Sequence, residues 1–256
     1  MKNSLHPLDL NCKRKRLRLY YINRRNIMKK KSSLVSLLIG MVALAIFLIP
    51  TKAAHADITV TNDCTDFSSI QVSVSANSTG KGNTDYFNIT PGQSDSWSRL
   101  SRSGFILAIV HNGMLRTYYT PTSASYSYKD GSLYQRNSST EITPLKKVVY
   151  SDTKGTKIVN MVNLSDGTVQ VALSKWKTGG YADYFELARP AVESWSRNND
   201  PRGFLVSMKA KSEMNEYIYY LPSIEYIGGN YLTIKNQAIL DWDERTPLKL
   251  VNVIKY

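Results

Sequence analysis

Apolar and polar residues alternate in short stretches throughout the chain after residue 57, and this pattern predicts β-strands. Residues 70–74 (IQVSV) and 169–173 (VQVAL) place an apolar side chain at every second position. A period of two is typical of a strand with one buried face. Residues 105–110 are apolar without interruption, which predicts a strand covered on both faces. No segment after residue 57 shows a convincing helical period over ten residues.

Turn-forming dipeptides separate these stretches. Such steps occur at Asn62-Asp63, Pro91-Gly92, Gly179-Gly180 and Gly228-Gly229. These residue types favour turns because of their backbone conformations and short side chains. The spacing of these turn residues predicts about seven or eight short strands in each half of the chain, as in a sandwich or small barrel.

Several short motifs occur twice in the same order. The pairs are Asp85-Tyr86-Phe87 with Asp183-Tyr184-Phe185, Ser96-Trp97-Ser98-Arg99 with Ser194-Trp195-Ser196-Arg197, Gly104-Phe105 with Gly203-Phe204, Tyr118-Tyr119-Thr120-Pro121 with Tyr219-Tyr220-Leu221-Pro222, and Thr143-Pro144-Leu145-Lys146 with Thr246-Pro247-Leu248-Lys249. The spacing between partners grows gradually along the chain, as small loop insertions in the second copy would produce. The sequence therefore predicts an internal duplication.

The predicted fold is all-β, with two tandem homologous β-sandwich (or small barrel) units after an N-terminal signal helix. We call residues 57–150 repeat 1 and residues 157–256 repeat 2, with residues 151–156 as a short polar linker. About 100 residues are enough for an independent sandwich, so two domains are the preferred arrangement. The alternative is one larger sandwich that both halves build around a pseudo-twofold axis.

Residues 1–56 form a leader with the features of a secretory signal peptide. Three lysines at 29–31 precede an apolar run at 34–49, and residues 54–56 (AHA) form a small-x-small cleavage site. These features predict a bacterial secreted protein whose mature chain begins at Asp57. An uncleaved membrane anchor is the alternative, for which the apolar run is slightly short. Met28 is an alternative translation start, because the lysines follow it directly.

The basic charge of the chain is concentrated in this leader. The whole chain has 33 Lys and Arg against 20 Asp and Glu, a formal net charge of +13. The leader holds twelve of the basic residues and one acid, which leaves 21 basic and 19 acidic residues after position 56. Nucleic-acid binding depends on the neutralisation of phosphates, so a nearly neutral mature chain is not expected to bind nucleic acid.

The residue types used in common catalytic and metal sites are scarce after the leader. His111 is the one histidine and Cys64 the one cysteine. Zinc sites built on two or three histidines or on four thiolates are therefore excluded. A Cys64–His111 dyad would require two strand ends to converge. We expect His111 to be an exposed loop residue and Cys64 a buried free thiol, with no catalytic residue, cofactor or metal, so the protein is expected not to be an enzyme.

The densest acidic cluster surrounds Trp242 and is found in repeat 2 only. It consists of Asp241, Asp243 and Glu244. Carboxylates of this kind can bind calcium or a sugar, but a solvated turn is the preferred interpretation.

The Trp-Ser-Arg motif is the strongest local feature of each repeat. Residues two apart on a strand lie on the same face, so Arg99 can stack on Trp97, and Arg197 on Trp195. Each pair could form a binding platform for a sugar ring, a lipid phosphate or a carboxylate. The alternative, which we prefer, is structural: a buried tryptophan with an arginine bonded to loop carbonyls.

Tyrosines are concentrated in two clusters. The first consists of Tyr118, Tyr119, Tyr126 and Tyr128, and the second of Tyr217, Tyr219, Tyr220, Tyr226 and Tyr231. Alternate tyrosines on one strand point to one side, so one row can pack in the core while the other faces solvent. An exposed tyrosine row would favour recognition of carbohydrate, protein or a membrane interface, and we expect ligand contacts there.

Secretion, duplication, aromatic–arginine motifs and scarce catalytic groups together favour a secreted non-enzymatic binding protein. Its two similar β domains would act on a cell surface, a glycan or another extracellular target, where duplication raises avidity. Its expected partner is an extracellular glycan, lipid or protein surface, with membrane contact allowed. A membrane-active β-type toxin resembling cytolysins is the first alternative, and an extracellular structural protein is the second.

Overall fold

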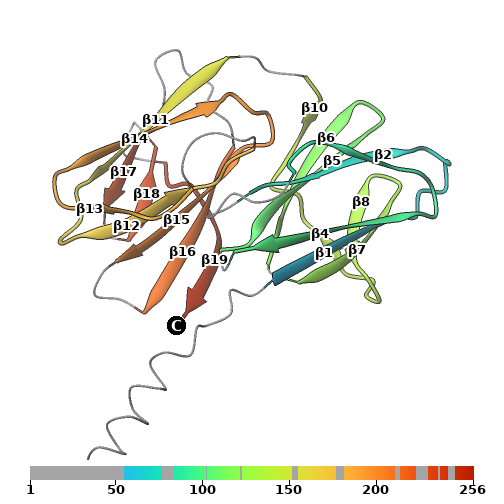
Figure 1. Ribbon diagram of the computed structural model, residues 1–256, viewed down its shortest axis with the longest axis horizontal. Helices are drawn as coiled ribbons and strands as arrows, with labels where there is room; N and C mark the ends of the chain where they lie inside the picture. The colour runs from blue at the N-terminus through green and yellow to red at the C-terminus, as the bar shows by residue number, and fades with distance from the viewer. Residues whose placement is uncertain are drawn as a thin grey trace, which may run out of the picture. The chain divides into compact units, whose positions relative to one another are not determined.

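The computed structural model shows an all-β chain, with four sheets that form about two domains (Figure 1). It describes residues 55–76, 83–101, 103–121, 123–151, 155–176, 182–210, 214–222, 230–235, 237–241 and 246–256. These residues belong to one compact unit, 53–256. They contain strands and no helix, and accordingly none of them lies in a helix able to span a membrane. The predicted signal helix falls outside the described residues.

Repeat 1 contains ten strands in two sheets. They are β1 (His55–Asn62), β2 (Ile70–Val74), β3 (Phe87–Ile89), β4 (Ser94–Leu100), β5 (Phe105–His111), β6 (Met114–Thr120), β7 (Ala124–Lys129), β8 (Ser132–Gln135), β9 (Glu141–Ile142) and β10 (Lys146–Val149). The strand order is β4-β1-β7-β8-β9 in one sheet, called the β1 sheet, and β10-β6-β5-β2-β3 in the other, called the β5 sheet.

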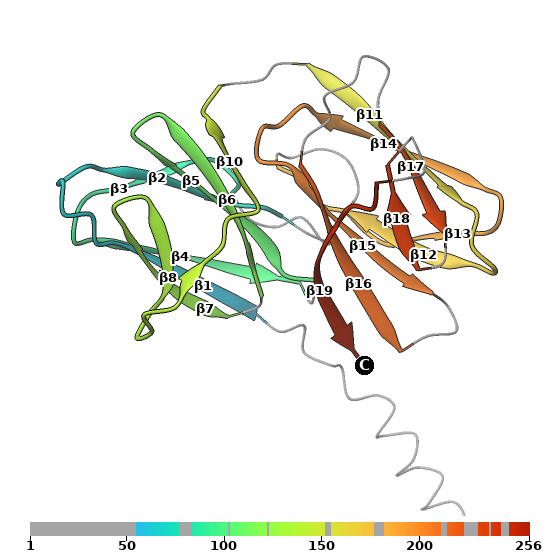
Figure 2. The same cartoon turned by 180° about the vertical axis from the view of Figure 1, so that it is seen from behind.

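Repeat 2 reproduces this arrangement. Its strands are β11 (Thr156–Asn163), β12 (Val169–Leu173), β13 (Phe185–Leu187), β14 (Val192–Asn198), β15 (Phe204–Ala210), β16 (Asn215–Leu221), β17 (Asn230–Lys235), β18 (Ala238–Leu240) and β19 (Lys249–Lys255). The β11 sheet has the order β14-β11-β17-β18, and the β15 sheet has the order β13-β12-β15-β16-β19 (Figure 2). Apart from the strand β9, the two repeats therefore share one topology.

The strand registers also agree between the repeats. The first strand of each repeat pairs in parallel with a later strand of the same sheet. In repeat 1 these strands are β1 and β7, and in repeat 2 they are β11 and β17. Trp97 lies opposite Ile58, and Trp195 lies opposite Val159. Each tryptophan meets a phenylalanine edge-on, at centroid distances of 5.9 and 6.0 Å. The duplicated motifs thus occupy equivalent positions, as the sequence predicts.

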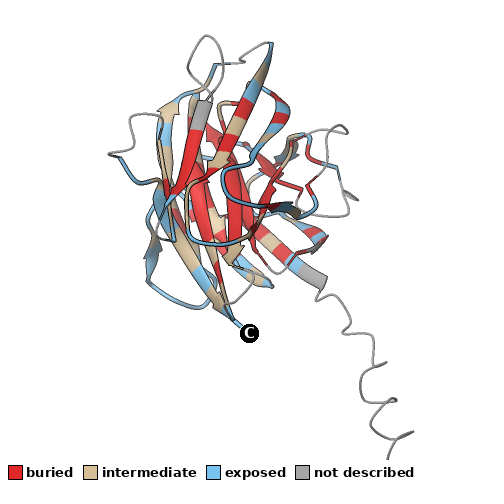
Figure 3. Cartoon of the chain, turned by 90° about the vertical axis from the view of Figure 1, so that its left-hand side faces the viewer, coloured by how far each residue is buried: buried red, intermediate tan, exposed pale blue. Residues whose placement is uncertain are grey.

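Each pair of sheets encloses a core. In repeat 1 the core joins Ile58 and Val60 of the β1 sheet to Val72, Leu107 and other residues of the β5 sheet. The alternation along β2 holds at the start of the strand, where the exposed Gln71 lies between the buried Ile70 and Val72, but the polar Ser73 is buried as well. Figure 3 shows the buried residues concentrated in the strands.

Strand β5 is buried along its whole length on both faces, as its continuous apolar sequence predicts. Phe105, Leu107 and Ile109 belong to the core of repeat 1. Ile106, Ala108 and Val110 point to the other side and join the apolar cluster of repeat 2. The β5 sheet therefore serves two cores, and the repeats are not two separate sandwiches joined only by a linker.

Polar side chains also connect the repeats, and the buried Arg202 is one of them. Its Nη1 donates to Ser73 Oγ at 2.8 Å and to the Thr84 carbonyl at 3.0 Å. Its Nε and Nη2 donate to both carboxylate oxygens of Asp200, and the guanidinium lies 3.8 Å from the ring centroid of Trp176. The charges of Arg202 and Asp200 are thereby paired with each other, as buried ions require.

Glu216 is a second buried charge at the contact between the repeats. Its Oε1 accepts hydrogen bonds from Ser103 Oγ at 2.6 Å and from the Tyr184 hydroxyl, and its Oε2 accepts one from the Tyr256 hydroxyl. These three donors come from both repeats. A carboxylate with several donors tolerates burial far better than an isolated one.

A glycine with positive φ begins the central strand of each repeat. Gly104 has φ +73° and Gly203 has φ +76°. A Cβ on Gly203 would lie 2.5 Å from the Leu221 carbonyl oxygen, and one on Gly104 would lie 2.6 Å from that of Thr120. The recurring Gly-Phe motif therefore reflects a close backbone approach that has no room for a side chain.

We expect Gly203→Ala to lower the free energy of unfolding by about 1–3 kcal/mol more than Gly92→Ala, as measured by chemical denaturation of the full chain. Both glycines have positive φ, so both variants bear a similar backbone strain of about 1–2 kcal/mol. Only Gly203 also meets backbone atoms, because a Cβ on Gly92 has nothing within 4 Å. Equal losses for the two variants would contradict the close approach.

Candidate functional site

The Trp-Arg pair of repeat 1 lies inside the fold. Trp97 and Arg99 are both about 95% buried on β4. The Arg99 guanidinium donates to the Asn83 and Ser98 carbonyls. Burial lowers the pKa of Arg99. A side chain in this position is not available as a surface platform.

The pair of repeat 2 is held in the same way. Arg197 donates from Nε to the Ser174 carbonyl at 3.1 Å, from Nη2 to the Leu173 carbonyl at 3.0 Å and from Nη1 to the Ser196 carbonyl at 3.0 Å. Desolvation lowers its pKa to about 10. The guanidinium thus links three backbone carbonyls beside the buried Trp195, which favours the structural interpretation of the motif.

The expectation of exposed tyrosine rows is wrong for most of the residues concerned. Five of them are buried, namely Tyr118, Tyr126, Tyr128, Tyr219 and Tyr220. Tyr119 and Tyr217 are half-buried, Tyr226 lies outside the described residues, and the side chain of Tyr231 is not described. The reason is that β6 and β16 have apolar cover on both faces, while Tyr126 and Tyr128 of β7 both point into the core of repeat 1.

The buried tyrosine hydroxyls find partners within the protein. Tyr126 donates to Thr120 Oγ1 at 2.7 Å, Tyr219 to the Gln237 carbonyl at 2.6 Å and Tyr220 to the Arg202 carbonyl at 3.2 Å. Desolvation raises the pKa of Tyr219 to about 12. These hydroxyls serve the fold, as buried polar groups usually do.

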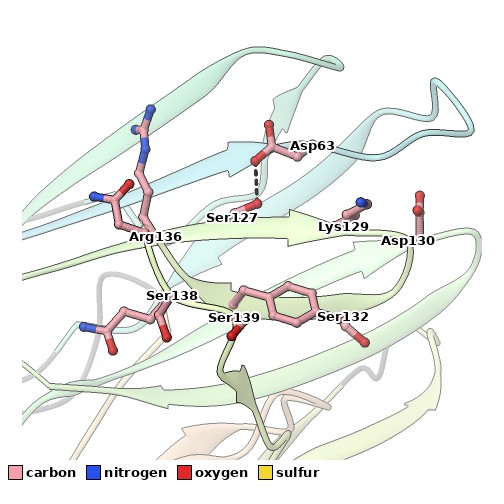
Figure 4. A pocket seen from close by; sticks show the side chains of 11 residues that line it. Asp63, Ser127, Lys129, Asp130, Ser132, Arg136, Ser138 and Ser139 are labelled. Atoms are coloured by element: carbon pink, nitrogen blue, oxygen red, sulfur yellow. Dashed lines mark hydrogen bonds between the residues drawn. The ribbon is translucent and has the colours of Figure 1, made fainter.

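The structure places a polar pocket where the sequence analysis expected none, on the β7–β8 hairpin of repeat 1 (Figure 4). Its volume is about 740 Å³. Four serines line it, together with Asp63, Lys129, Asp130, Tyr134, Arg136 and Asn137, among others. Apart from the half-buried Tyr134, the residues that line it therefore all have hydroxyl, amide or charged side chains.

Hydrogen bonds fix the acidic side of this pocket. Asp63 accepts a hydrogen bond from the Ser127 hydroxyl (Figure 4). Asp130 accepts two bonds of 2.8 Å from Thr65, one from the backbone N–H and one from Oγ1. These bonds lower the pKa of Asp130. The β1–β2 loop is thereby tied to the β7–β8 turn.

The corresponding hairpin of repeat 2 differs from this lining at described positions, and residues 242–245, which follow β18, lie outside the described residues. The pairing of Ser127 with Tyr134 corresponds to that of Thr233 with Leu240. Two pairs further along the same register, Ala238 takes the place of Ser132. The pocket is thus a feature of repeat 1 that the duplicated hairpin of repeat 2 does not reproduce with the same side chains.

The pocket could have been suspected from the sequence only in part. Asp130-Gly131 is a typical hairpin-turn dipeptide, and both residues have positive φ. The polar run from Gln135 to Thr140 follows directly. Its composition indicates a loop, but it does not indicate that the loop folds beside the hairpin.

The structure brings Cys64 and His111 together, which the sequence analysis considered an unlikely arrangement. The prediction of a buried free thiol at Cys64 is confirmed. The expectation of an exposed His111 is wrong, because this residue is the last of β5 and its ring packs edge-on against Tyr128 at 5.5 Å. Burial raises the pKa of Cys64, so the thiol is not an activated nucleophile.

The acidic cluster around Trp242 is described only at Asp241. Asp243 and Glu244 lie outside the described residues. Asp241 itself is half-buried, and its backbone N–H donates to the Thr246 carbonyl at 2.9 Å.

Comparisons with known proteins leave the family open. No model of a known protein family matches the chain, and no curated protein matches it in sequence. The chain is similar to a crystal structure described as a "putative cell adhesion protein" from Bacteroides ovatus ATCC 8483. The identity is 9%, the match covers 79% of this chain and 98% of the other, and the TM-score is 0.23. A likeness of this extent carries no conclusion about function.

We expect Arg197→Ala to lower the free energy of unfolding by about 2–4 kcal/mol, because it leaves buried carbonyls without a donor. The matched control is Ser196→Ala, on the exposed side of the same strand, which should change stability by no more than about 0.5 kcal/mol. Urea unfolding of the full chain measures both. A folded, equally stable Arg197→Ala variant would restore the platform interpretation.

Proposed function

We propose that this chain is a secreted, non-enzymatic binding protein, and that the polar pocket of repeat 1 binds a hydroxyl-rich ligand, in particular a glycan of an extracellular surface. The observation that carries the proposal is the pocket lining. Glycans are bound through networks of hydroxyl, amide and charged groups beside an aromatic ring, and Ser132, Asn137, Arg136 and Tyr134 offer these groups within one pocket.

The binding side chains are held by a fixed framework. Strands β7 and β8 pair in regular antiparallel register from Tyr126 to Lys129. The Ser127 and Asp130 contacts already described restrain the neighbouring loop. Binding is favoured when little conformational freedom is lost on association, and a hairpin restrained in this way supports a recognition role.

We further propose that the two repeats are homologous β-sandwiches with the boundaries given above, and that their roles have diverged. The shared topology and the equivalent tryptophans support a common origin. The replacement of Tyr134 and Ser132 by Leu240 and Ala238 in repeat 2 supports a division of labour, in which repeat 1 binds and repeat 2 supports it. This replaces the simpler idea of two equal binding sites.

The glycan proposal is tested by titrating the full chain onto an array of immobilised glycans and repeating the strongest hit with variants. Tyr134→Ala should weaken that interaction about tenfold or more, since aromatic side chains dominate recognition sites. Lys129→Ala should also weaken it. The matched controls in repeat 2 are Leu240→Ala and Lys235→Ala, which occupy the same register positions and should leave the binding unchanged.

The same preparation separates binding from membrane damage. Dye-loaded phosphatidylcholine–phosphatidylglycerol vesicles should remain intact in the presence of the protein. Dye release would favour the toxin alternative, and equal losses for the variants of both repeats would show that the pocket is not the binding site.

Secretion is proposed from the leader, with cleavage after Ala56. Strand β1 begins at His55, and His55 and Ala56 pair with Leu100 and Arg99, so cleavage would shorten β1 by two paired residues. N-terminal sequencing of the protein recovered from culture medium should give Asp57 as the first residue. A chain that stays with the cells and retains residues 34–49 would contradict the proposal.

A further inference from the structure

Three different potential metal ligands converge at one end of repeat 1. Cys64 and Asp66 lie in the β1–β2 loop, and His111 ends β5. The Cys64 sulfur, an Asp66 carboxylate oxygen and a His111 ring nitrogen all lie within 4.8 Å of one another. Three chemically distinct donors meet here, although Cys64 is the one cysteine and His111 the one histidine after residue 56.

The imidazole nitrogen in this cluster has no hydrogen bond among the described residues. His111 is only 5% exposed, and its Nε2 atom is buried without a hydrogen-bond partner. The nearest charged atom is Asp66 Oδ2, at 3.4 Å, which lies beyond good hydrogen-bond geometry. A buried nitrogen without a hydrogen bond lowers the stability of the fold by about 1–3 kcal/mol. A further partner for Nε2 would remove this cost.

The spacing of the cluster fits a shared metal ion. A tetrahedral zinc ion with ordinary bond lengths holds its nitrogen and carboxylate-oxygen ligands about 3.4 Å apart, and the Nε2–Oδ2 distance is 3.4 Å. The sulfur must approach by at most about 1.2 Å to reach its place in such a shell. The Asp66 side chain is 43% exposed, which leaves an entry path for an ion.

Neighbouring groups hold the ligands in this orientation. Asp66 accepts hydrogen bonds from the Ser68 backbone N–H at 3.0 Å and from Asn112 Nδ2 at 3.2 Å. The Cys64 backbone N–H donates to Asn62 Oδ1 at 3.1 Å, and Tyr128 packs against the His111 ring. Supporting contacts of this kind orient the ligands of metal sites.

Repeat 2 supplies an internal comparison, because its framework is the same while Cys64 and His111 are replaced by other residue types. Asn163 repeats the role of Asn62, since each side chain donates to two backbone carbonyls and accepts an N–H two residues on. The residue at that N–H is Ser165 in place of Cys64. The residue that aligns with His111 on β15 is Ala210. The fold therefore does not require this cluster.

We propose that Cys64, Asp66 and His111 form a binding site for a borderline-soft divalent ion, with Zn²⁺ as the ion that fits best. A thiolate, an imidazole and a carboxylate are the three ligand types that Zn²⁺ takes in proteins. When the ion binds, the thiol proton passes to solvent and the sulfur coordinates as thiolate. Three protein ligands leave a fourth position for water or a ligand atom. This site is independent of the proposed glycan pocket.

The test is calorimetric titration of Zn²⁺ into the full chain, in a Cys12→Ser background that makes Cys64 the sole thiol. One equivalent should bind, and Cys64→Ser, Asp66→Asn and His111→Gln should each weaken the affinity at least about tenfold. Co²⁺ serves as an optical probe, because coordination by Cys64 should produce a thiolate-to-cobalt charge-transfer band that Cys64→Ser abolishes.

The matched control is Ser165→Ala, which changes the equivalent position of repeat 2 and should leave the Zn²⁺ affinity unchanged. Thermal melts in EDTA establish that each variant folds, and if His111→Gln does not, Cys64→Ser and Asp66→Asn decide the question. Equal Zn²⁺ affinities for the parent and Cys64→Ser, or a Co²⁺ complex without the charge-transfer band, would overturn the proposal.

Discussion

Strand β5 has no face that meets water, and the organisation of both repeats follows from this constraint. One row of its side chains completes the core of repeat 1 and the other enters the apolar cluster of repeat 2. The two repeats must therefore bury one sheet face each against the other, because an apolar strand exposed on one side would be costly. The faces available to a ligand are consequently those of the β1 and β11 sheets, together with the loops at the ends of the strands.

The contact between the repeats contains charged side chains as well as apolar ones. Arg202 and Glu216 sit where the outward faces of the β5 and β15 sheets meet, and each is satisfied by groups of both repeats. Removing the partners of a buried charge lowers the stability of the fold far more than losing an apolar contact does. Such groups tolerate few relative positions of the two sheets, so they specify the arrangement of the repeats more than they stabilise it.

The fold was predictable from local patterns, but the site was not. Period-two alternation and the paired motifs gave the strands, the all-β class and the two-faced burial of β5. Alternation separates two faces of a strand without indicating what covers each, and for this reason Tyr118 and Tyr220 were candidates for ligand contact although both are buried. His111 was misplaced for a similar reason, since its position beside the Asn-Gly turn does not reveal that its ring packs on Tyr128.

The differences between the two repeats follow a pattern. Positions that serve packing are the same in both copies, as in the tryptophan, arginine and glycine motifs, because the same sheets must close around the same cores. The loop between the first two strands runs from Asn62 to Ile70 in repeat 1 and only from Asn163 to Val169 in repeat 2. The longer loop contributes Asp63 to the pocket and both Cys64 and Asp66 to the cluster with His111. The residues proposed to bind ligands therefore lie where repeat 1 departs from repeat 2, whereas the packing residues lie where the two repeats agree.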